Sequence, residues 1–226
     1  METPDALASA AAGMRAQAAR LDLIAADLAN AGTPGYRSSE PVSARFADRL
    51  GAAATPLEPQ GALRLTGVPT DVALSGPGFF AVATPHGVRY TRDGRFAADP
   101  SGTLVDSRGN RVLGTLGPVR FPHRAAIESD GRIASNGQTI DRLRIVAVVG
   151  AVDQGDGYCT AASGATLRRS AAQVRSGYLE DSGVNPIAEM TALVSSQRAF
   201  EANQKAAQRA DETLRRAVTD VPAVQS

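Results

Sequence analysis

Metal-binding and redox-active side chains are almost absent from this sequence of 226 residues. It has no tryptophan, two histidines (His86 and His123) and a single cysteine, Cys159. Zinc sites built from several cysteine and histidine ligands are therefore excluded, as are disulfides within the chain. The sequence predicts neither a metal site nor a cofactor.

An excess of one charge is also lacking. Twenty-four basic residues, all arginine except Lys205, stand against 23 acidic residues, and the net charge is +1. Proteins that bind nucleic acid by bulk electrostatics present a clearly basic face, so nucleic acid is not an expected partner. No stretch approaches the ~18 apolar residues of a membrane span. The N-terminus lacks the pattern of a cleavable signal peptide, which on its own would suggest a cytoplasmic protein.

Signatures of catalysis are weak or missing. The Gly76–Gly78 segment lacks the lysine and the following helix of a phosphate-binding loop. Two carboxylate pairs, Glu128/Asp130 and Glu180/Asp181, are each close in sequence and are expected to be solvated rather than catalytic. We therefore expect that the protein is not an enzyme.

What the sequence has in abundance is alanine, and its first thirty residues predict an amphipathic helix. Leu7, Met14, Leu21 and Leu28 recur every seven residues, with Ile24 on the same face. Asn30, Gly32, Pro34 and Gly35 follow and predict the end of the helix. This face is either a coiled-coil seam or the buried face of an ordinary amphipathic helix.

A second helix is predicted near the C-terminus, beginning at Asn185-Pro186. Its candidate seam follows a spacing of three and four through Met190, Leu193, Gln197, Phe200, Gln204 and Leu214. Polar residues in such a seam need partners if they are buried. The helix is therefore either a surface helix with a narrow apolar stripe or one that contacts polar groups on neighbouring chains.

Between the helices the sequence periodicity changes to that of β-strands. Residues 37–70 are rich in proline and small residues and predict an extended connector. Short alternating runs then predict strands at 72–74, 79–83, 88–91, 103–105, 112–113 and 143–149, separated by turn dipeptides such as Asp93-Gly94 and Asn136-Gly137. Residues 151–176 are read either as strands that close this domain or as a return linker.

Three segments in this order resemble the flagellar rod and hook proteins. Residues 27–36, DLANAGTPGY, are similar to the N-terminal signature N-L-A-N-x-x-T-x-G-[FY] of that family, and residues 177–185, GYLEDSGVN, to its G-x-L-E-x-S-N-V segment. Residues 197–203, QRAFEAN, resemble its Q-R-A-[YF]-E-x-N helix. The segments DVAL, GFF and YTRDGRF between residues 71 and 96 resemble its β-domain run. Asp27 and Gly183 stand where the family usually has asparagine.

The resemblance implies an α+β fold with a discontinuous, coiled-coil-like helical domain and a central all-β domain. The implied domains are a helix in residues 1–36, the connector 37–70, a β-rich outer domain 71–176 and a second helix in 177–226. Assembly contacts are expected at Leu7, Met14, Leu21, Ile24, Leu28, Asn30, Met190, Leu193, Gln197, Phe200, Gln204 and Leu214. The family motif residues are Thr33, Pro34, Gly35, Tyr36, Glu180, Ser182 and Asn203.

The function implied by the resemblance is that of a structural subunit of the bacterial flagellar rod. Such subunits are exported unfolded by the flagellar type III apparatus and polymerise helically in the periplasm, into a shaft that links motor to hook. The expected partners are other rod subunits, copies of the same chain and the export apparatus, without membrane insertion. The short chain is most similar to the proximal rod protein, and a distal rod or hook subunit is the alternative. A ligand- or carbohydrate-binding β domain with helical oligomerisation ends is the alternative from another class.

Overall fold

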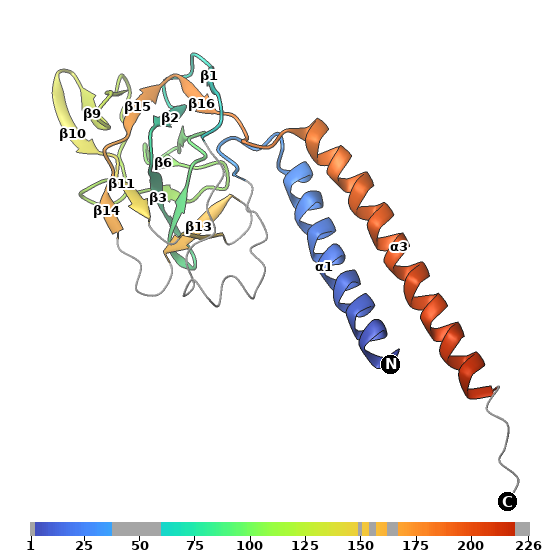
Figure 1. The fold of residues 1–226 in the computed structure, drawn as a ribbon. Helices are drawn as coiled ribbons and strands as arrows, with labels where there is room; N and C mark the ends of the chain where they lie inside the picture. The colour runs from blue at the N-terminus through green and yellow to red at the C-terminus, as the bar shows by residue number, and fades with distance from the viewer. Residues whose placement is uncertain (1–2, 38–59, 149–150, 154–156, 162–166, 220–226) are drawn as a thin grey trace, which may run out of the picture. The chain divides into compact units, whose positions relative to one another are not determined.

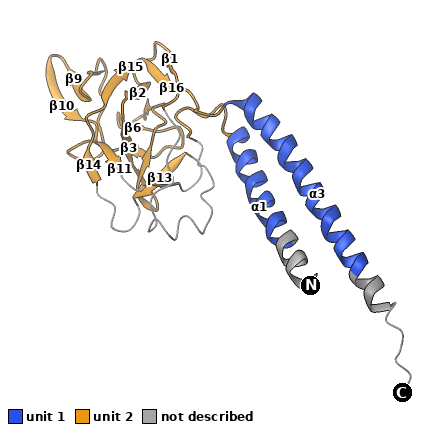
Figure 2. Ribbon diagram, viewed as in Figure 1, with its two compact units in different colours: residues 1–29, 185–226 blue, residues 30–184 orange. Residues whose placement is uncertain are grey.

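The computed structural model describes residues 3–37, 60–148, 151–153, 157–161 and 167–219 (Figure 1). The chain forms two compact units. Unit 1 comprises residues 1–29 and 185–226, and unit 2 comprises residues 30–184 (Figure 2). Both ends of the chain therefore belong to one unit, and the central unit is inserted between them.

Unit 1 consists of two long helices, α1 (Thr3–Ala29) and α3 (Pro186–Thr219), which run antiparallel to each other (Figure 1). Helix α3 begins where the sequence predicts, because the Asn185 side chain accepts hydrogen bonds from the backbone amides of Ile187 and Ala188 at 3.1 and 3.3 Å. Pro186 takes the first helical position, where its missing amide proton costs nothing.

Unit 2 is built from sixteen short strands within the described ranges. They are β1 (Leu63–Leu65), β2 (Val72–Ser75), β3 (Phe79–Thr84), β4 (Gly87–Thr91), β5 (Ala97–Ala98), β6 (Leu104–Val105), β7 (Arg111–Val112), β8 (Ala126–Ile127), β9 (Arg132–Ser135), β10 (Gln138–Arg142), β11 (Ile145–Val148), β12 (Ala151–Asp153), β13 (Tyr158–Ala161), β14 (Leu167–Arg169), β15 (Gln173–Ser176) and β16 (Tyr178–Glu180). The largest sheet has the order β12-β13-β4-β3-β7-β6-β5, and β11 joins it by pairing with β3 and β14. All the pairings between these strands are antiparallel.

The core of unit 2 lies around β2 and β3. Val72, Leu74, Phe80 and Val82 are at most 1% exposed, and the Phe80 ring packs edge-on against Phe96 with centroids 5.2 Å apart. Successive side chains along a strand point to opposite faces of the sheet. Phe80 and Val82 of β3 therefore belong to the main hydrophobic cluster, and Phe79 and Ala81 to a smaller cluster on the opposite face. The apolar runs that predicted strands therefore supply the core.

The borders of the β-rich region differ from the expected 71–176. Strand β1 lies within the expected connector and pairs with β16, which lies within the expected C-terminal helical segment. These two short strands join the two ends of unit 2 through main-chain hydrogen bonds, which have no signature in side-chain patterning. Residues 38–59 of the connector lie outside the described ranges.

Most of the described residues in 151–176 form strands rather than a return linker. Strand β13 pairs with β4, β14 with β11, and β15 with β2. The segment therefore closes the sheets of unit 2. Residues 154–156 and 162–166 are outside the described part of the chain.

Candidate assembly surfaces and the joint of the central unit

The α1 residues expected at an assembly interface share one face of the helix. Ile24 is buried, while Met14, Leu21 and Leu28 are partly buried, as is Asn30 just after the helix. This burial matches the heptad spacing read from the sequence. The side chains of Leu7 and Leu214 lie outside the described residues.

The expected α3 residues share one side of the helix but differ in exposure. Leu193 and Phe200 are partly buried, whereas Met190, Gln197 and Gln204 are exposed. The side chain of Ser196 is buried instead, and its hydroxyl donates a hydrogen bond to Gln17 Oε1 of α1 at 2.9 Å. The face of α3 that meets α1 therefore carries a polar pair that the sequence reading did not identify.

A second close approach between the helices involves the family motif residue Asn203. A Cβ atom at Gly13 would lie 3.3 Å from the Asn203 side-chain nitrogen. Glycine thus lets the amide of Asn203 reach the backbone of α1. The pair of helices is held by small and polar contacts as well as by apolar ones.

The motif residues after α1 form a tight turn. Thr33 donates its amide to Asn30 O at 2.9 Å and its hydroxyl to Asn30 Oδ1 at 3.2 Å. Pro34 and Tyr36 are buried. Gly35 has a φ of +67°, and a Cβ atom there would lie 2.5 Å from the Arg92 carbonyl carbon, so the turn requires glycine on both conformational and steric grounds.

The C-terminal motif contacts this turn directly. Gly35 donates its amide to the Glu180 carbonyl at 2.7 Å, and Gly183 donates its amide to the Tyr36 carbonyl at 3.0 Å. Ser182 accepts a hydrogen bond from the Val184 amide at 3.3 Å. Segments that are far apart in the sequence are thus joined at one place, which we call the terminal joint (residues 33–37, 61, 92 and 180–183).

Glu180 occupies the centre of the terminal joint and is 1% exposed. Its Oε1 accepts hydrogen bonds from Arg37 Nη2 at 3.0 Å and from the Gly61 amide at 3.3 Å. Its Oε2 lies 3.0 Å from Arg92 Nε, in an ion pair whose angle does not make a hydrogen bond. The expectation that Glu180 is solvated is therefore wrong, because the pairing of β1 with β16 encloses it; Asp181, whose side chain is 42% exposed, pairs with Arg64 at the surface.

Arg92 is as buried as Glu180, with 1% of its side chain exposed. Its Nη1 donates to the Gly78 carbonyl at 2.7 Å. Burial lowers the pKa of Arg92 to about 10, and the carboxylate of Glu180 opposes this shift. The guanidinium is still charged at neutral pH, so this buried charge depends on Glu180 for compensation. The sequence contains Arg92 in the YTRDGRF segment, but its role, like that of Arg37, was missed because burial is set by the fold.

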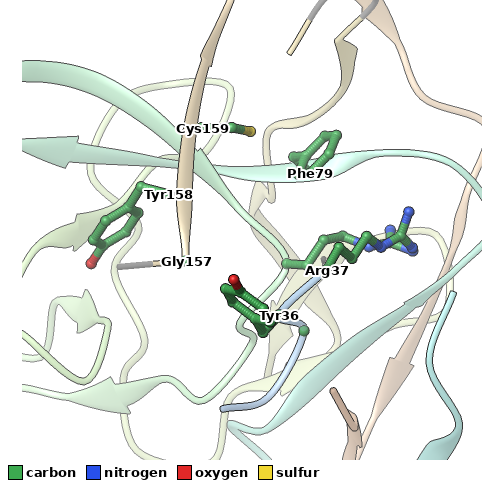
Figure 3. A pocket seen from close by; sticks show the side chains of 8 residues that line it. Tyr36, Arg37, Phe79, Gly157, Tyr158 and Cys159 are labelled. Atoms are coloured by element: carbon green, nitrogen blue, oxygen red, sulfur yellow. The ribbon is translucent and has the colours of Figure 1, made fainter. Parts of the chain in front are cut away.

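A small pocket borders the terminal joint. Figure 3 shows Tyr36 and Arg37 on one side, with Phe79 of β3 and Tyr158 and Cys159 of β13 on the other. The Tyr158 hydroxyl donates to Asp106 at 2.5 Å and accepts from Asn110 at 2.9 Å. Burial, and then the bond to Asp106, raise the pKa of Tyr158 to about 12. Tyr158 is thus a protonated hydrogen-bond donor at neutral pH.

Metal-binding arrangements do not emerge from the part of the chain that the structure describes. No cluster of three or more His, Cys, Asp or Glu side chains is placed to hold a metal ion within it. None of its helices is both long and apolar enough to cross a membrane. The conspicuous features are the faces of two helices and a buried joint.

Comparison with known proteins identifies the family to which this chain belongs. Three family models match in sequence order: "Flagella basal body rod protein" at residues 7–37, "Flagellar hook protein FlgE/F/G D1 domain" at 73–140 and "Flagellar basal body rod FlgEFG protein C-terminal" at 175–220. The chain is 31% identical to the flagellar basal-body rod protein FlgF of Mesorhizobium japonicum, over 87% of this chain and 89% of that protein. The chain belongs to the flagellar basal-body rod protein family.

Further relatives carry both rod-protein names. Identity is 34% with FlgF of Escherichia coli, over 85% of this chain and 88% of the relative, and 32% with FlgG of Borreliella burgdorferi, over 92% and 96%. The protein is a structural subunit of the flagellar basal-body rod and assembles there with other rod subunits. The relatives are rod proteins rather than enzymes, and a ligand-binding β domain is not favoured.

The family matches coincide with the structural features described above. The N-terminal match covers α1 and the turn at residues 33–37, and the C-terminal match covers β16 and α3. Several motif residues in these two matches, Gly35, Tyr36, Glu180 and Asn203 among them, therefore belong to the terminal joint or to the contact between α1 and α3.

Proposed function

We propose that this rod subunit is exported unfolded through the flagellar type III apparatus and polymerises helically in the periplasm, as part of the shaft that links motor to hook. The observation that carries the proposal is the composition of unit 1. Its two helices meet through Gly13, Gln17, Ser196 and Asn203 as well as through leucine and phenylalanine. Small and polar contacts of this kind bury less apolar area than large apolar side chains would, and neighbouring subunits would supply further burial.

The helical pair is proposed to be coiled-coil-like. On α3, Leu193, Ser196, Phe200 and Asn203 are buried or partly buried at spacings of three and four. On α1 the residues with this burial run from Met14 to Leu28 at the same alternation. This is the spacing of a seam between two helices that wind around each other.

Within the rod we propose a proximal position. The support is the resemblance of this short chain to the proximal rod protein. Its alignments with two FlgF relatives span 224 and 227 positions, while that with a FlgG relative spans 256. The alignment with the FlgG relative is longer, yet it covers a similar number of residues of this chain, so it contains more gaps. The chain is thus closer in length to the relatives named FlgF.

Export is tested by fractionating cells in which the flagellar export apparatus is inactivated. The proposal predicts that the chain then stays in the cytoplasm, whereas in wild-type cells it is recovered from the periplasm with the basal bodies. A periplasmic protein that carries a cleavable signal peptide serves as the control and should be unaffected. Recovery of the chain from the periplasm without the export apparatus would exclude this route.

A further inference from the structure

A cavity of about 330 Å³ in unit 2 is lined by arginines from two neighbouring strands. Arg144 directly precedes β11, Arg168 and Arg169 lie on β14, and all three side chains are exposed. Leu167, also on β14 and 42% exposed, adds a large apolar side chain. We call these four residues the β14 edge site.

The positive charge of the β14 edge site is not compensated within the part of the chain that the structure describes. Asp130 is the one carboxylate among the described residues that line the cavity, and it already pairs with Arg142 at 2.7 Å. The three arginines of the site have neither an ion pair nor a side-chain hydrogen bond in the described ranges. The site therefore offers three cations to a binding partner.

The same site has unpaired main-chain groups. Strand β14 pairs with β11 along one edge (Figure 1), and its other edge has no partner strand among the described residues. The Ser170 amide donates to the Ile145 carbonyl at 3.3 Å. In an antiparallel pair the amides of alternate residues face the same strand, so the Arg168 amide also faces β11, whereas the amide and carbonyl of Arg169 face outward. An edge of this kind is a template for a further strand.

The arginine side chains flank this free edge on both faces of the sheet. Arg169 lies opposite Val146 of β11, and Arg168 lies opposite Ala147. Cross-strand partners share a face and successive side chains alternate between faces, so Arg144 is on the face of Arg169 and Arg168 is on the other. A segment added along the edge would also alternate its side chains between the two faces. Consecutive acidic residues would therefore meet an arginine on each face.

We propose that the β14 edge site binds an extended acidic segment of a partner protein, which adds as a strand beside β14. Its main chain pairs with the outward groups of Arg169, and its consecutive carboxylates lie against Arg168 and Arg169. Main-chain hydrogen bonds supply affinity in this mode of binding, and the side chains supply selectivity. The site belongs to unit 2, so the proposal does not depend on the proposed export or on polymerisation through the helices.

Fluorescence anisotropy with the full-length chain tests the site. The probe is a labelled peptide of about eight residues, long enough for one strand, with a central run of glutamates between valines. We expect saturable binding that weakens with added salt. Arg168→Glu and Arg169→Glu should each weaken it at least about tenfold, because like charges then face each other. Arg175→Glu, at an exposed position of β15 outside the cavity, is the matched control and should leave binding unchanged.

Amide hydrogen exchange resolved by nuclear magnetic resonance distinguishes strand addition from simple anion binding. At saturating peptide the outward amide of Arg169 should gain protection, while the Arg168 amide, which faces β11, should keep the protection it has in the free chain. The same peptide with glutamine in place of glutamate is the control for charge and should bind at least about tenfold more weakly.

Several results would overturn the proposal. Equal binding of the glutamine peptide would remove the role of charge, and unchanged exchange at Arg169 in the bound state would reduce the site to an anion site. Binding to vesicles of phosphatidylglycerol without binding of the peptide would assign the arginines to a lipid surface. Absence of peptide binding, together with self-association of Arg168→Glu or Arg169→Glu, would mean that the arginines only protect a free edge from pairing. Each of these results would leave the proposed function intact, because that function rests on unit 1.

Discussion

At the scale of single residues, Glu180 connects parts of the chain that are distant in sequence. Its carboxylate contacts Arg37, Gly61 and Arg92, and its carbonyl accepts the Gly35 amide. One acidic side chain thus compensates two guanidinium groups, of which Arg92 is 1% and Arg37 14% exposed. Removing it would leave a buried charge on Arg92 without compensation, which is far more costly than losing a surface pair.

Glu180→Gln should therefore destabilise unit 2 by about 3–5 kcal/mol, the range for breaking a buried ion pair. The matched control is Asp181→Asn, which removes the neighbouring exposed pair with Arg64 and should cost at most about 1 kcal/mol. Chemical unfolding followed by circular dichroism measures both. Equal effects of the two substitutions would mean that the terminal joint does not hold unit 2 together.

Gly35 offers a second test at this scale. Gly35→Ala places a Cβ atom against the Arg92 backbone at a φ of +67° and should destabilise unit 2 by more than about 1 kcal/mol. Gly32→Ala is the control three residues earlier, since a Cβ atom at Gly32 meets nothing within 4 Å. If both variants melt at the same temperature, the turn at residues 33–37 is not packed against Arg92 as described.

The sequence identified the motif residues of the terminal joint but not what they do. Glu180 and Gly35 stand out in the resemblance, yet the burial of Glu180 follows from the pairing of β1 with β16. Strand β1 has three residues, of which Arg64 and Leu65 are exposed, so it leaves no alternating pattern to detect. Long-range pairing of this kind cannot be read from local composition.

At the scale of elements, the two long helices were predicted well and their contact face only in part. The expected α3 seam follows Met190, Gln197 and Gln204, while the face that meets α1 follows Ser196 and Asn203. Both patterns share Leu193 and Phe200, and in a helix with few large apolar residues the phase of the seam is ambiguous. In the structure, the hydrogen bond between Ser196 and Gln17 shows which side of α3 faces α1. Because Gln17 lies on α1, the sequence of α3 alone does not reveal this pairing.

The strands, too, were predicted only in part. Apolar runs with several buried residues, such as those of β2, β3 and β4, were predicted from the sequence. The hairpin of β9 and β10 was missed as a pair of strands, because six of its nine strand residues are polar and leave no clear apolar alternation. Only its turn was recognised: Asn136 and Gly137 have φ of +52° and +78°, as the two central residues of a type I′ turn require.

A charge placed on the face between α1 and α3 should destabilise unit 1 and leave the stability of unit 2 unchanged. Leu21→Asp or Phe200→Asp buries a carboxylate between the helices and should cost roughly 2 kcal/mol or more of helix-pair stability, and block rod assembly. Unit 2 has its own core and should stay folded. Amide hydrogen exchange measures this as lost protection in α1 and α3 with unchanged protection in β3 and β4.

Ala202→Asp is the control for these two substitutions, because Ala202 is exposed on α3 and a charge there remains in water. It should preserve both the helix protection and the swimming of cells that carry it. Loss of protection in β3 and β4 with Phe200→Asp would contradict the independence of the two units.

At the scale of the whole molecule, one chain folds into a unit made from both its ends and a unit made from its middle. Helix α1 has its partner only when α3, the last described element, is present. The helical unit can thus form only from a complete chain, whereas the core of unit 2 lies within residues 72–174. This order fits the proposed export of the chain in an unfolded state, with the helical unit completed on assembly.

The central claim is that this chain is a subunit of the flagellar rod that assembles through its helical unit. It is tested most directly by electron microscopy of basal bodies from cells that lack the chain and carry either the wild-type gene or Phe200→Asp. The account predicts complete rods with the wild-type gene, and rods that are truncated or missing with the variant and without the gene. Complete rods in cells that lack the chain altogether would contradict it.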